Sequence, residues 1–277
     1  MSTVMTEAPE ETARKSLVEY EAADGVAILT LDDPPANTYT HQMMRDLDEA
    51  VLRARFDPDV DVIVITGKGE KFFCAGANIN MLQKADPTWK YYFCLHANET
   101  LLRLEHTPKL VIAALGGHTV GGGLEIAMAA DLRIARRGAG KVGLPEVSLG
   151  VLPGTGGTQR LTRLIGTAKA IQLMAEGSNF DFDEAERLGI VNRVLDADSG
   201  AAFLEQVLEY ARTFTRPGKA TFAVGNIKRA CQTGGQLPLE QGLTLERELQ
   251  ALLFNSEDAK EGLTAYVEKR AASFTGK

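Results

Sequence analysis

The sequence lacks an apolar run long enough to cross a membrane. Each apolar stretch in its 277 residues is interrupted by Arg, Asp, Glu or Lys before reaching the roughly 18 residues that a spanning helix needs. The first 15 residues contain Glu7, Glu10 and Glu11 and no apolar block, so they resemble neither a secretory signal nor an Arg-rich transit peptide. We therefore expect no membrane partner, and a flexible N-terminal tail over residues 1–15.

Cysteine and histidine are scarce, and basic residues are in the minority. Cys74, Cys94 and Cys231 form no C-x-x-C pair, and the four histidines show no metal-ligand spacing, which argues against a disulfide framework and against a metal site. A reducing cytoplasm is the expected location. The formal net charge of −7 provides no bulk attraction for nucleic acid, so we expect no nucleic-acid partner.

Several motifs of cofactor-dependent and hydrolytic enzymes are also missing. The chain has no G-x-x-x-x-G-K-[ST] phosphate loop and no G-x-S-x-G nucleophile elbow. Residues 138–143 do satisfy G-x-G-x-x-G, but they lie far from the first βα unit, and no suitably placed acidic residue follows. We therefore expect no nicotinamide and no other separate cofactor.

The order of hydrophobic patterns predicts one large α/β domain. Two β-rich runs joined by a short turn predict a hairpin, and three helical patterns are each followed by a short β-branched or apolar run. The predicted strands are 17–21, 26–31, 62–66, 111–115 and 132–135, and the helices are 41–56, about 88–105 and a short one after Gly122. Such alternation favours a largely parallel sheet.

The C-terminal third is predicted to be mainly helical. Leu204, Val207, Leu208 and Ala211 form one apolar stripe at helical spacing, and Leu245, Leu249, Leu252 and Leu253 form another. We interpret both stripes as packing faces or contacts between copies of the chain. The expected division is a core over residues 16–200 and a helical region over 201–277.

Two glutamates occupy apolar settings. Glu125 follows three glycines and precedes an apolar helical segment, and Glu146 follows Leu144-Pro145. A solvated glutamate at a helix N-terminus is the alternative interpretation of Glu125. A partly buried carboxyl has a raised pKa and exchanges protons near neutrality. Glycine-rich segments at 74–78, 116–123 and 154–157 are suited either to tight turns or to directing peptide N–H groups at a ligand oxygen.

These segments together resemble the enoyl-CoA hydratase branch of the crotonase superfamily. The resemblance is carried by residues 111–131, 143–146 and 153–161, with an upstream match at 73–77 and a C-terminal one at 261–270. It covers nearly everything after residue 16. It implies a spiral of ββα units with a helical C-terminal trimerisation region, and trimers that often pair into hexamers.

The resemblance also implies a set of site residues. Ala77 and Gly122 match the backbone donors of an oxyanion hole, Glu125 the general base, Glu146 the general acid, and Gly154 the residue that helps to hold a water molecule. The positions implied to contact substrate or coenzyme A are Ala36, Ala75, Asn78, Ile79, Asn80, Tyr266 and Lys269. An exposed helix lysine is the alternative interpretation of Lys269.

Two departures from the family pattern bear on substrate choice. Residues 77–80 read Ala-Asn-Ile-Asn where relatives usually have Asp and Lys in the second and fourth places, so a phosphate contact is expected to be missing at Asn80. Tyr39 is bulkier than the usual leucine and is expected to reshape the entrance. The aromatic residues Trp89, Tyr91, Tyr92 and Phe93 have two interpretations, core packing and an acyl pocket.

The implied activity is the addition of water to a 2-enoyl-CoA to give a 3-hydroxyacyl-CoA, in fatty acid β-oxidation or in amino acid or aromatic acid breakdown. Other reactions of the superfamily remain alternatives: double-bond isomerisation, hydroxycinnamoyl-CoA hydratase-lyase action and thioester hydrolysis. A non-catalytic module that binds RNA or protein is a third hypothesis.

Overall fold

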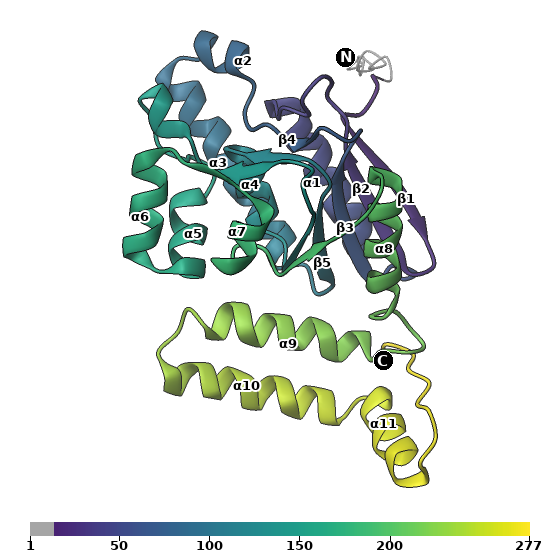
Figure 1. Ribbon diagram of the computed structural model, residues 1–277. Coiled ribbons are helices and arrows are strands. Elements are labelled where there is room, and N and C mark those ends of the chain that lie inside the picture. The colour runs from purple at the N-terminus through teal and green to yellow at the C-terminus, as the bar shows by residue number, and fades with distance from the viewer. Residues whose placement is uncertain (1–13) are drawn as a thin grey trace, which may run out of the picture.

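The structure is a computed structural model that describes residues 14–277, and two β-sheets form its centre (Figure 1). The larger sheet has six strands in the order β1-β2-β3-β5-β7-β10. Their bounds are Val18–Ala23, Val26–Leu31, Val62–Gly67, Leu110–Leu115, Leu132–Arg136 and Arg193–Leu195. The β1–β2 pair is antiparallel and every other neighbouring pair is parallel, so the predicted hairpin and parallel sheet are confirmed.

A second sheet alternates with the first along the chain. Its four strands follow the order β4-β6-β8-β9, with bounds Phe72–Cys74, His118–Val120, Lys141–Gly143 and Asn179–Asp181. Each turn of the chain adds one strand to each sheet, as β3 then β4, β5 then β6, and β7 then β8. Helices follow β4 and β6, so the predicted spiral of ββα units is present. The loops of successive turns consequently come together at the smaller sheet.

Helices cover both faces of the six-stranded sheet. Strand β3 alternates its side chains between them, as a strand must. Ile63 and Ile65 pack in the core that includes α1 (His41–Phe56) and α3 (Pro87–Glu105), whereas Val62 and Val64 pack with α8 (Gly200–Arg212). Because both faces are buried, the strand is apolar from Val62 to Ile65, and the hydroxyl of Thr66 donates to the Ala114 carbonyl oxygen.

The remaining helices complete the spiral and the C-terminal region. They are α2 (Ile79–Lys84), α4 (Gly122–Met128), a 3-10 turn (Glu146–Leu149), α5 (Gly157–Ile165), α6 (Thr167–Glu176), α7 (Phe182–Arg187), α9 (Thr221–Gly234), α10 (Leu239–Phe254) and α11 (Glu257–Glu268). Helices α9 and α10 lie side by side below the sheets (Figure 1). No helix within residues 14–277 is long and apolar enough to span a bilayer.

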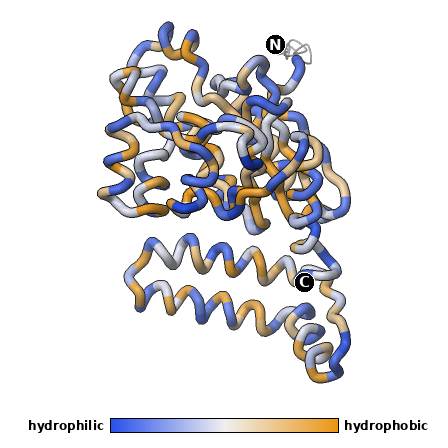
Figure 2. Tube along the Cα trace, in the orientation of Figure 1, coloured by the Kyte–Doolittle hydropathy of each residue, from blue (hydrophilic) through white to orange (hydrophobic). Residues whose placement is uncertain are grey.

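The two predicted apolar stripes of the C-terminal third differ in how far they are buried. The stripe of α8 packs on the larger sheet, as a packing face should. On α10, Leu249 is buried but Leu252 is 49% exposed, and polar and apolar stretches alternate along the helix (Figure 2). Of the predicted tail, residues 1–13 lie outside the described residues, while Arg14 and Lys15 pair with Asp46 and Asp32.

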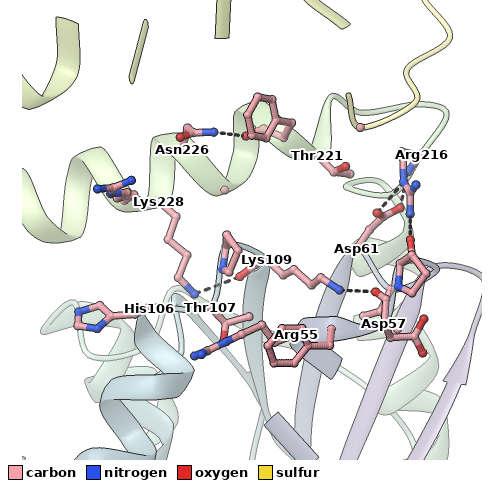
Figure 3. A pocket seen from close by; sticks show the side chains of 18 of the residues that line it. Arg55, Asp57, Asp61, His106, Thr107, Lys109, Arg216, Thr221, Asn226 and Lys228 are labelled. Atoms are coloured by element: carbon pink, nitrogen blue, oxygen red, sulfur yellow. Dashed lines mark hydrogen bonds and ion pairs between the residues drawn. The ribbon is translucent and has the colours of Figure 1, made fainter. Parts of the chain in front are cut away.

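A cavity of about 830 Å³ separates α9 from the core, and charged side chains line it (Figure 3). Lys228 of α9 reaches across to the carboxylate of Asp131 at 2.8 Å, and Arg216 pairs with Asp61 at the same distance. Lys109 donates to the carbonyl oxygens of Ala54 and Asp57. These cations are thus engaged by acceptors within the protein, and we interpret the Lys228 pair as an attachment of α9 to the core.

Breaking the buried Lys228–Asp131 pair is predicted to destabilise the fold. Burial lowers the pKa of Lys228 and raises that of Asp131, and each charge opposes the shift of the other. Replacing Lys228→Met leaves the Asp131 carboxylate buried without its counter-ion, which we expect to cost about 3 kcal/mol in the free energy of unfolding. Urea titration measures the loss. The exposed Lys219→Met is the matched control, and equal stability of the two variants would contradict the prediction.

Candidate active site

A second cavity, of about 520 Å³, gathers most of the predicted site residues. The larger cavity beside α9 contains none of the predicted catalytic residues. Ala75, Ala77, Ile79, Gly122, Glu125, Glu146 and Gly154 all line the smaller one. They come from the segment after β4, from α4, from the 3-10 turn and from the loop before α5, which lie far apart in the sequence.

The two predicted oxyanion-hole segments run against each other. A Cβ atom added to Gly76 would lie 3.1 Å from the nitrogen of Gly122, the first residue of α4. Ala77 forms a parallel β-bridge with Tyr39. The Tyr39 N–H donates to the Gly76 carbonyl oxygen, and the Asn78 N–H donates to the Tyr39 carbonyl oxygen. The N–H of Ala77 itself therefore points away from Tyr39. The N–H of Gly122 is one of the first in its helix and has no intrahelical acceptor.

Glu125 is a buried carboxyl held by backbone donors. Its side chain is in α4, and the residue is 1% exposed. The N–H groups of Thr155 and Gly157 both donate to Oε1 at 2.7 Å. Burial raises the pKa of Glu125, and these two hydrogen bonds oppose the rise because they favour the ionised form. The other carboxyl oxygen is bound by neither amide.

Glu146 starts the 3-10 turn and is held differently. Its Oε2 atom is buried and has no hydrogen-bond partner among residues 14–277. Burial raises its pKa to about 7, the charge of Glu125 adds to the rise, and Lys90 opposes it. A Cβ atom on Gly121, whose φ is +56°, would lie 2.9 Å from Glu146 Oε1. Glycine at position 121 therefore lets this carboxyl approach the start of α4.

Tyr39 is placed differently from the expectation that it reshapes the entrance. Its side chain lines the cavity, but the residue is 2% exposed, and its ring stacks on Phe93 with centroids 5.6 Å apart. Phe93 in turn stacks on Trp89, whereas Tyr91 and Tyr92 are exposed on α3. Trp89, Tyr91, Tyr92 and Phe93 do not line the cavity, which favours packing over an acyl pocket as their role.

The other predicted contact residues lie outside the cavity lining. Asn80 is exposed on α2, and Asn78 caps that helix by accepting the Met81 N–H. Ala36 accepts the Ala75 N–H through its carbonyl oxygen. Tyr266 is 86% exposed on α11, and Lys269 ends that helix, both on the far side of the chain from α2 (Figure 1).

The sequence did not single out three groups that the structure adds. Thr155 and Gly157 bind Glu125, and Lys90 lines the cavity. The glycine-rich segment 154–157 marked the neighbourhood of the first two but not their acceptor. Nothing in the sequence separates Lys90 from an ordinary lysine on a helix surface.

The arrangement suits proton transfer beside a polarised oxygen. Two carboxyls with raised pKa values face one cavity, and backbone donors meet at its wall. Among residues 14–277, no group of three or more His, Cys, Asp or Glu side chains is arranged to hold a metal ion.

Comparison with known proteins places the chain in a family. The model of the enoyl-CoA hydratase/isomerase family matches residues 21–277. A crotonyl-CoA hydratase from Syntrophomonas wolfei is 37% identical over 258 residues, covering 93% of this chain and 97% of the relative. A short-chain-enoyl-CoA hydratase from Clostridium acetobutylicum is 37% identical over 254 residues, covering 91% and 95%.

Solved structures agree with the sequence comparison. A crystal structure of an enoyl-CoA hydratase from Geobacillus kaustophilus superposes with a TM-score of 0.91 at 46% identity, covering 96% of this chain and 98% of that one. The predicted family and fold are thereby confirmed. The chain belongs to the enoyl-CoA hydratase/isomerase family, and within the crotonase superfamily it lies in the enoyl-CoA hydratase branch.

Proposed function

We propose that this protein adds water across the double bond of a 2-enoyl-CoA and so forms a 3-hydroxyacyl-CoA. The observation that carries the proposal is that Glu125 and Glu146 face one cavity in different environments. One carboxyl accepts two N–H groups, and the other has a buried oxygen with no partner among the described residues. The activities of the relatives from Syntrophomonas and Clostridium support the same reaction.

The thioester carbonyl is the group that we assign to the N–H donors of Ala77 and Gly122. Addition of water at C3 moves charge onto this oxygen, giving an enolate-like transition state. Donors that are already oriented stabilise that charge without reorganisation, and loss of one such donor typically costs about 3 kcal/mol in the activation barrier. Backbone donors suit this role because the sheet and helix fix their direction.

The two glutamates divide the proton transfers. Glu125, whose ionised form is stabilised by two amides, takes a proton from water as the oxygen bonds to C3. Glu146, whose pKa burial raises to about 7, keeps much of its proton up to neutrality and gives a proton to C2. Gly154 lines the cavity next to Thr155, and we assign it the role of helping to hold the water molecule that is added. Water supplies the hydroxyl group that bonds to C3, and the proton that Glu125 takes from it balances the proton that Glu146 gives to C2, so return of one proton through solvent restores both carboxyls. The addition is redox-neutral and needs no redox cofactor, and we propose that no separate cofactor takes part.

Hydration explains the presence of two acids better than the alternatives within the superfamily do. Isomerisation moves one proton between carbons of the substrate, which a single carboxyl can do, whereas hydration takes a proton from water and gives one to C2. Apolar side chains also line the cavity, and Leu149, Val151 and Leu152 are each more than half exposed there. These side chains suit an acyl chain.

The remaining assignments concern coenzyme A, assembly and location. We assign Ala75 and Ile79, which line the cavity, to contacts with the substrate. We assign Ala36, Asn78 and Asn80, which do not line it, to contacts with the coenzyme A part of the substrate outside the cavity. Tyr266 and Lys269 belong in this set only if another copy of the chain presents them, and the exposed apolar side chains of α10 and α11 support a homotrimer or homohexamer. Three cysteines without a disulfide are compatible with the cytoplasm.

Removal of either carboxylate is predicted to abolish most activity. Glu125→Gln and Glu146→Gln keep the side-chain size but cannot accept or donate the proton, so kcat with crotonyl-CoA should fall by about a hundred- to ten-thousand-fold. Loss of absorbance from the conjugated double bond measures the rate. Glu205→Gln, on the exposed face of α8, is the control and should retain full activity. Near-normal rates in both active-site variants would refute the mechanism.

Product analysis separates the alternative reactions. A panel of acyl-CoA thioesters, read by mass spectrometry, should show products heavier by one water molecule. An isomerase would give no change in mass, a hydrolase would release free coenzyme A, and a lyase would give two carbon fragments. Absence of turnover together with salt-sensitive RNA binding would favour the binding-module hypothesis.

The pH dependence of kcat/KM is predicted to be bell-shaped. As the pH rises through the Glu146 pKa of about 7, the general acid loses its proton and the rate should fall. As the pH falls through the Glu125 pKa, which burial holds above its ordinary value, the base becomes protonated and the rate should fall again. Rate measurements with crotonyl-CoA across this range test both limbs. A rate that rises steadily above neutrality would contradict the assignment.

A further inference from the structure

Tyr39 lies at the start of a chain of hydrogen bonds that leads to Glu125. Its phenol oxygen is 2.7 Å from Thr155 Oγ1, and both groups are buried. The backbone N–H of Thr155 in turn donates to Glu125 Oε1 at 2.7 Å. The link joins residues that are 116 positions apart in the sequence. Thr155 is therefore the only residue between the phenol and the carboxyl in this chain of contacts.

The ring of Tyr39 is held in place on several sides. Its backbone bridges Ala77, and one face of the ring stacks on Phe93. A Cβ atom at position 122 would overlap the Tyr39 ring, so Gly122 provides the space that the ring occupies. Asn37 orders the preceding loop by donating to the carbonyl oxygens of Lys68 and Phe72. The phenol oxygen consequently has little freedom to move away from Thr155.

The phenol is a fixed partner for the Thr155 hydroxyl, and either oxygen can donate in the hydrogen bond between them. This bond holds the Thr155 side chain in place, and the Thr155 N–H is thereby kept directed at Glu125. Burial raises the pKa of Tyr39 well above its ordinary value, and the nearby Glu125 charge acts in the same direction, so the phenol keeps its proton.

We propose that Tyr39 is a positioning residue that acts through Thr155 to orient and stabilise the ionised carboxyl of Glu125. The inference rests on the proposed function, because it concerns the base of that reaction. The phenol holds the Thr155 side chain, the Thr155 N–H donates to Glu125, and the carboxylate is thereby fixed to accept a proton from water.

Other charged groups near Glu125 do not replace this contact. Glu146 approaches from the 3-10 turn, and the Glu125 charge raises the pKa of Glu146. Arg160 of α5 favours the ionised form of Glu125, but its guanidinium is bound to the Glu105 carboxylate through two hydrogen bonds. Cys74 and Cys94 are the remaining titratable groups beside Tyr39, and burial raises the pKa of Cys74 to about 12, which keeps that thiol neutral.

Tyr39→Phe is the decisive substitution, because it keeps the ring against Phe93 and Gly122 and removes only the hydroxyl. With crotonyl-CoA we expect kcat to fall about ten-fold, the scale of one lost hydrogen bond, with KM unchanged within about two-fold. The acid limb of the pH profile should move to higher pH, because a carboxylate whose Thr155 N–H donor is less well placed is protonated more easily. Tyr20→Phe, in β1 and away from the cavity, is the matched control and should change neither value.

Combination with Thr155→Val tests the route through Thr155. Valine keeps the backbone N–H and the shape of the side chain but removes the hydroxyl. If Tyr39 acts through Thr155, the double variant should be no slower than Thr155→Val alone. Thr155→Ser, which restores a hydroxyl, should recover the activity and the acid limb that valine loses. Independent, additive losses would overturn the proposed route.

A measurement without turnover separates this inference from the proposed function. Infrared titration of the carboxyl absorption, with Glu125→Gln as the reference, follows protonation of Glu125 directly. Tyr39→Phe should raise the protonated fraction at a given pH, and an unchanged titration would overturn the inference even in an active enzyme. Failure of the wild-type protein to hydrate any enoyl-CoA would instead overturn the proposed function, while the titration would still report on the Tyr39 contact.

Discussion

The buried carboxyl of Glu125 is the group around which the site is organised. A carboxylate removed from water must receive hydrogen bonds, and here the N–H groups of Thr155 and Gly157 provide them. These donors lie at the beginning of α5, so the loop over residues 153–157 must fold back over α4. Closing that loop also brings Gly154 to the cavity and Thr155 to Tyr39. One charged group thus determines the conformation of a segment that is 30 residues away in the chain.

The spiral provides the frame that makes this convergence possible. Strands β4, β6 and β8 are short parallel neighbours in the smaller sheet, and each is followed by a segment that lines the cavity. The carboxyl ends of parallel strands lie along one edge of a sheet, so Ala77, Gly122 and Glu146 are brought together by topology alone. The larger sheet and its helices supply the apolar core that fixes the positions of the successive turns of the spiral relative to one another.

Local patterns in the sequence predicted the elements whose conformation depends on residues near one another in the chain. The hairpin at Asp24-Gly25, the helix over 41–56 and the parallel strands are present as expected, as are the settings of Glu125 and Glu146. Contacts between distant hydroxyls could not be predicted, because neither Tyr39 nor Thr155 has a neighbour in sequence that indicates its partner. Amphipathic patterning likewise does not say what covers a helix, and Leu252 stays half exposed although it belongs to a regular stripe.

The contact between the Tyr39 ring and Gly122 has an evolutionary consequence. A methyl group at position 122 and a phenol ring at position 39 would require the same volume, so the two positions cannot vary independently. While position 39 is tyrosine, a substitution of Gly122 by alanine would clash with the ring. The substitution becomes tolerable only after the ring is replaced by a smaller side chain. Among descendants of this protein, tyrosine at position 39 and alanine at position 122 should therefore not occur together.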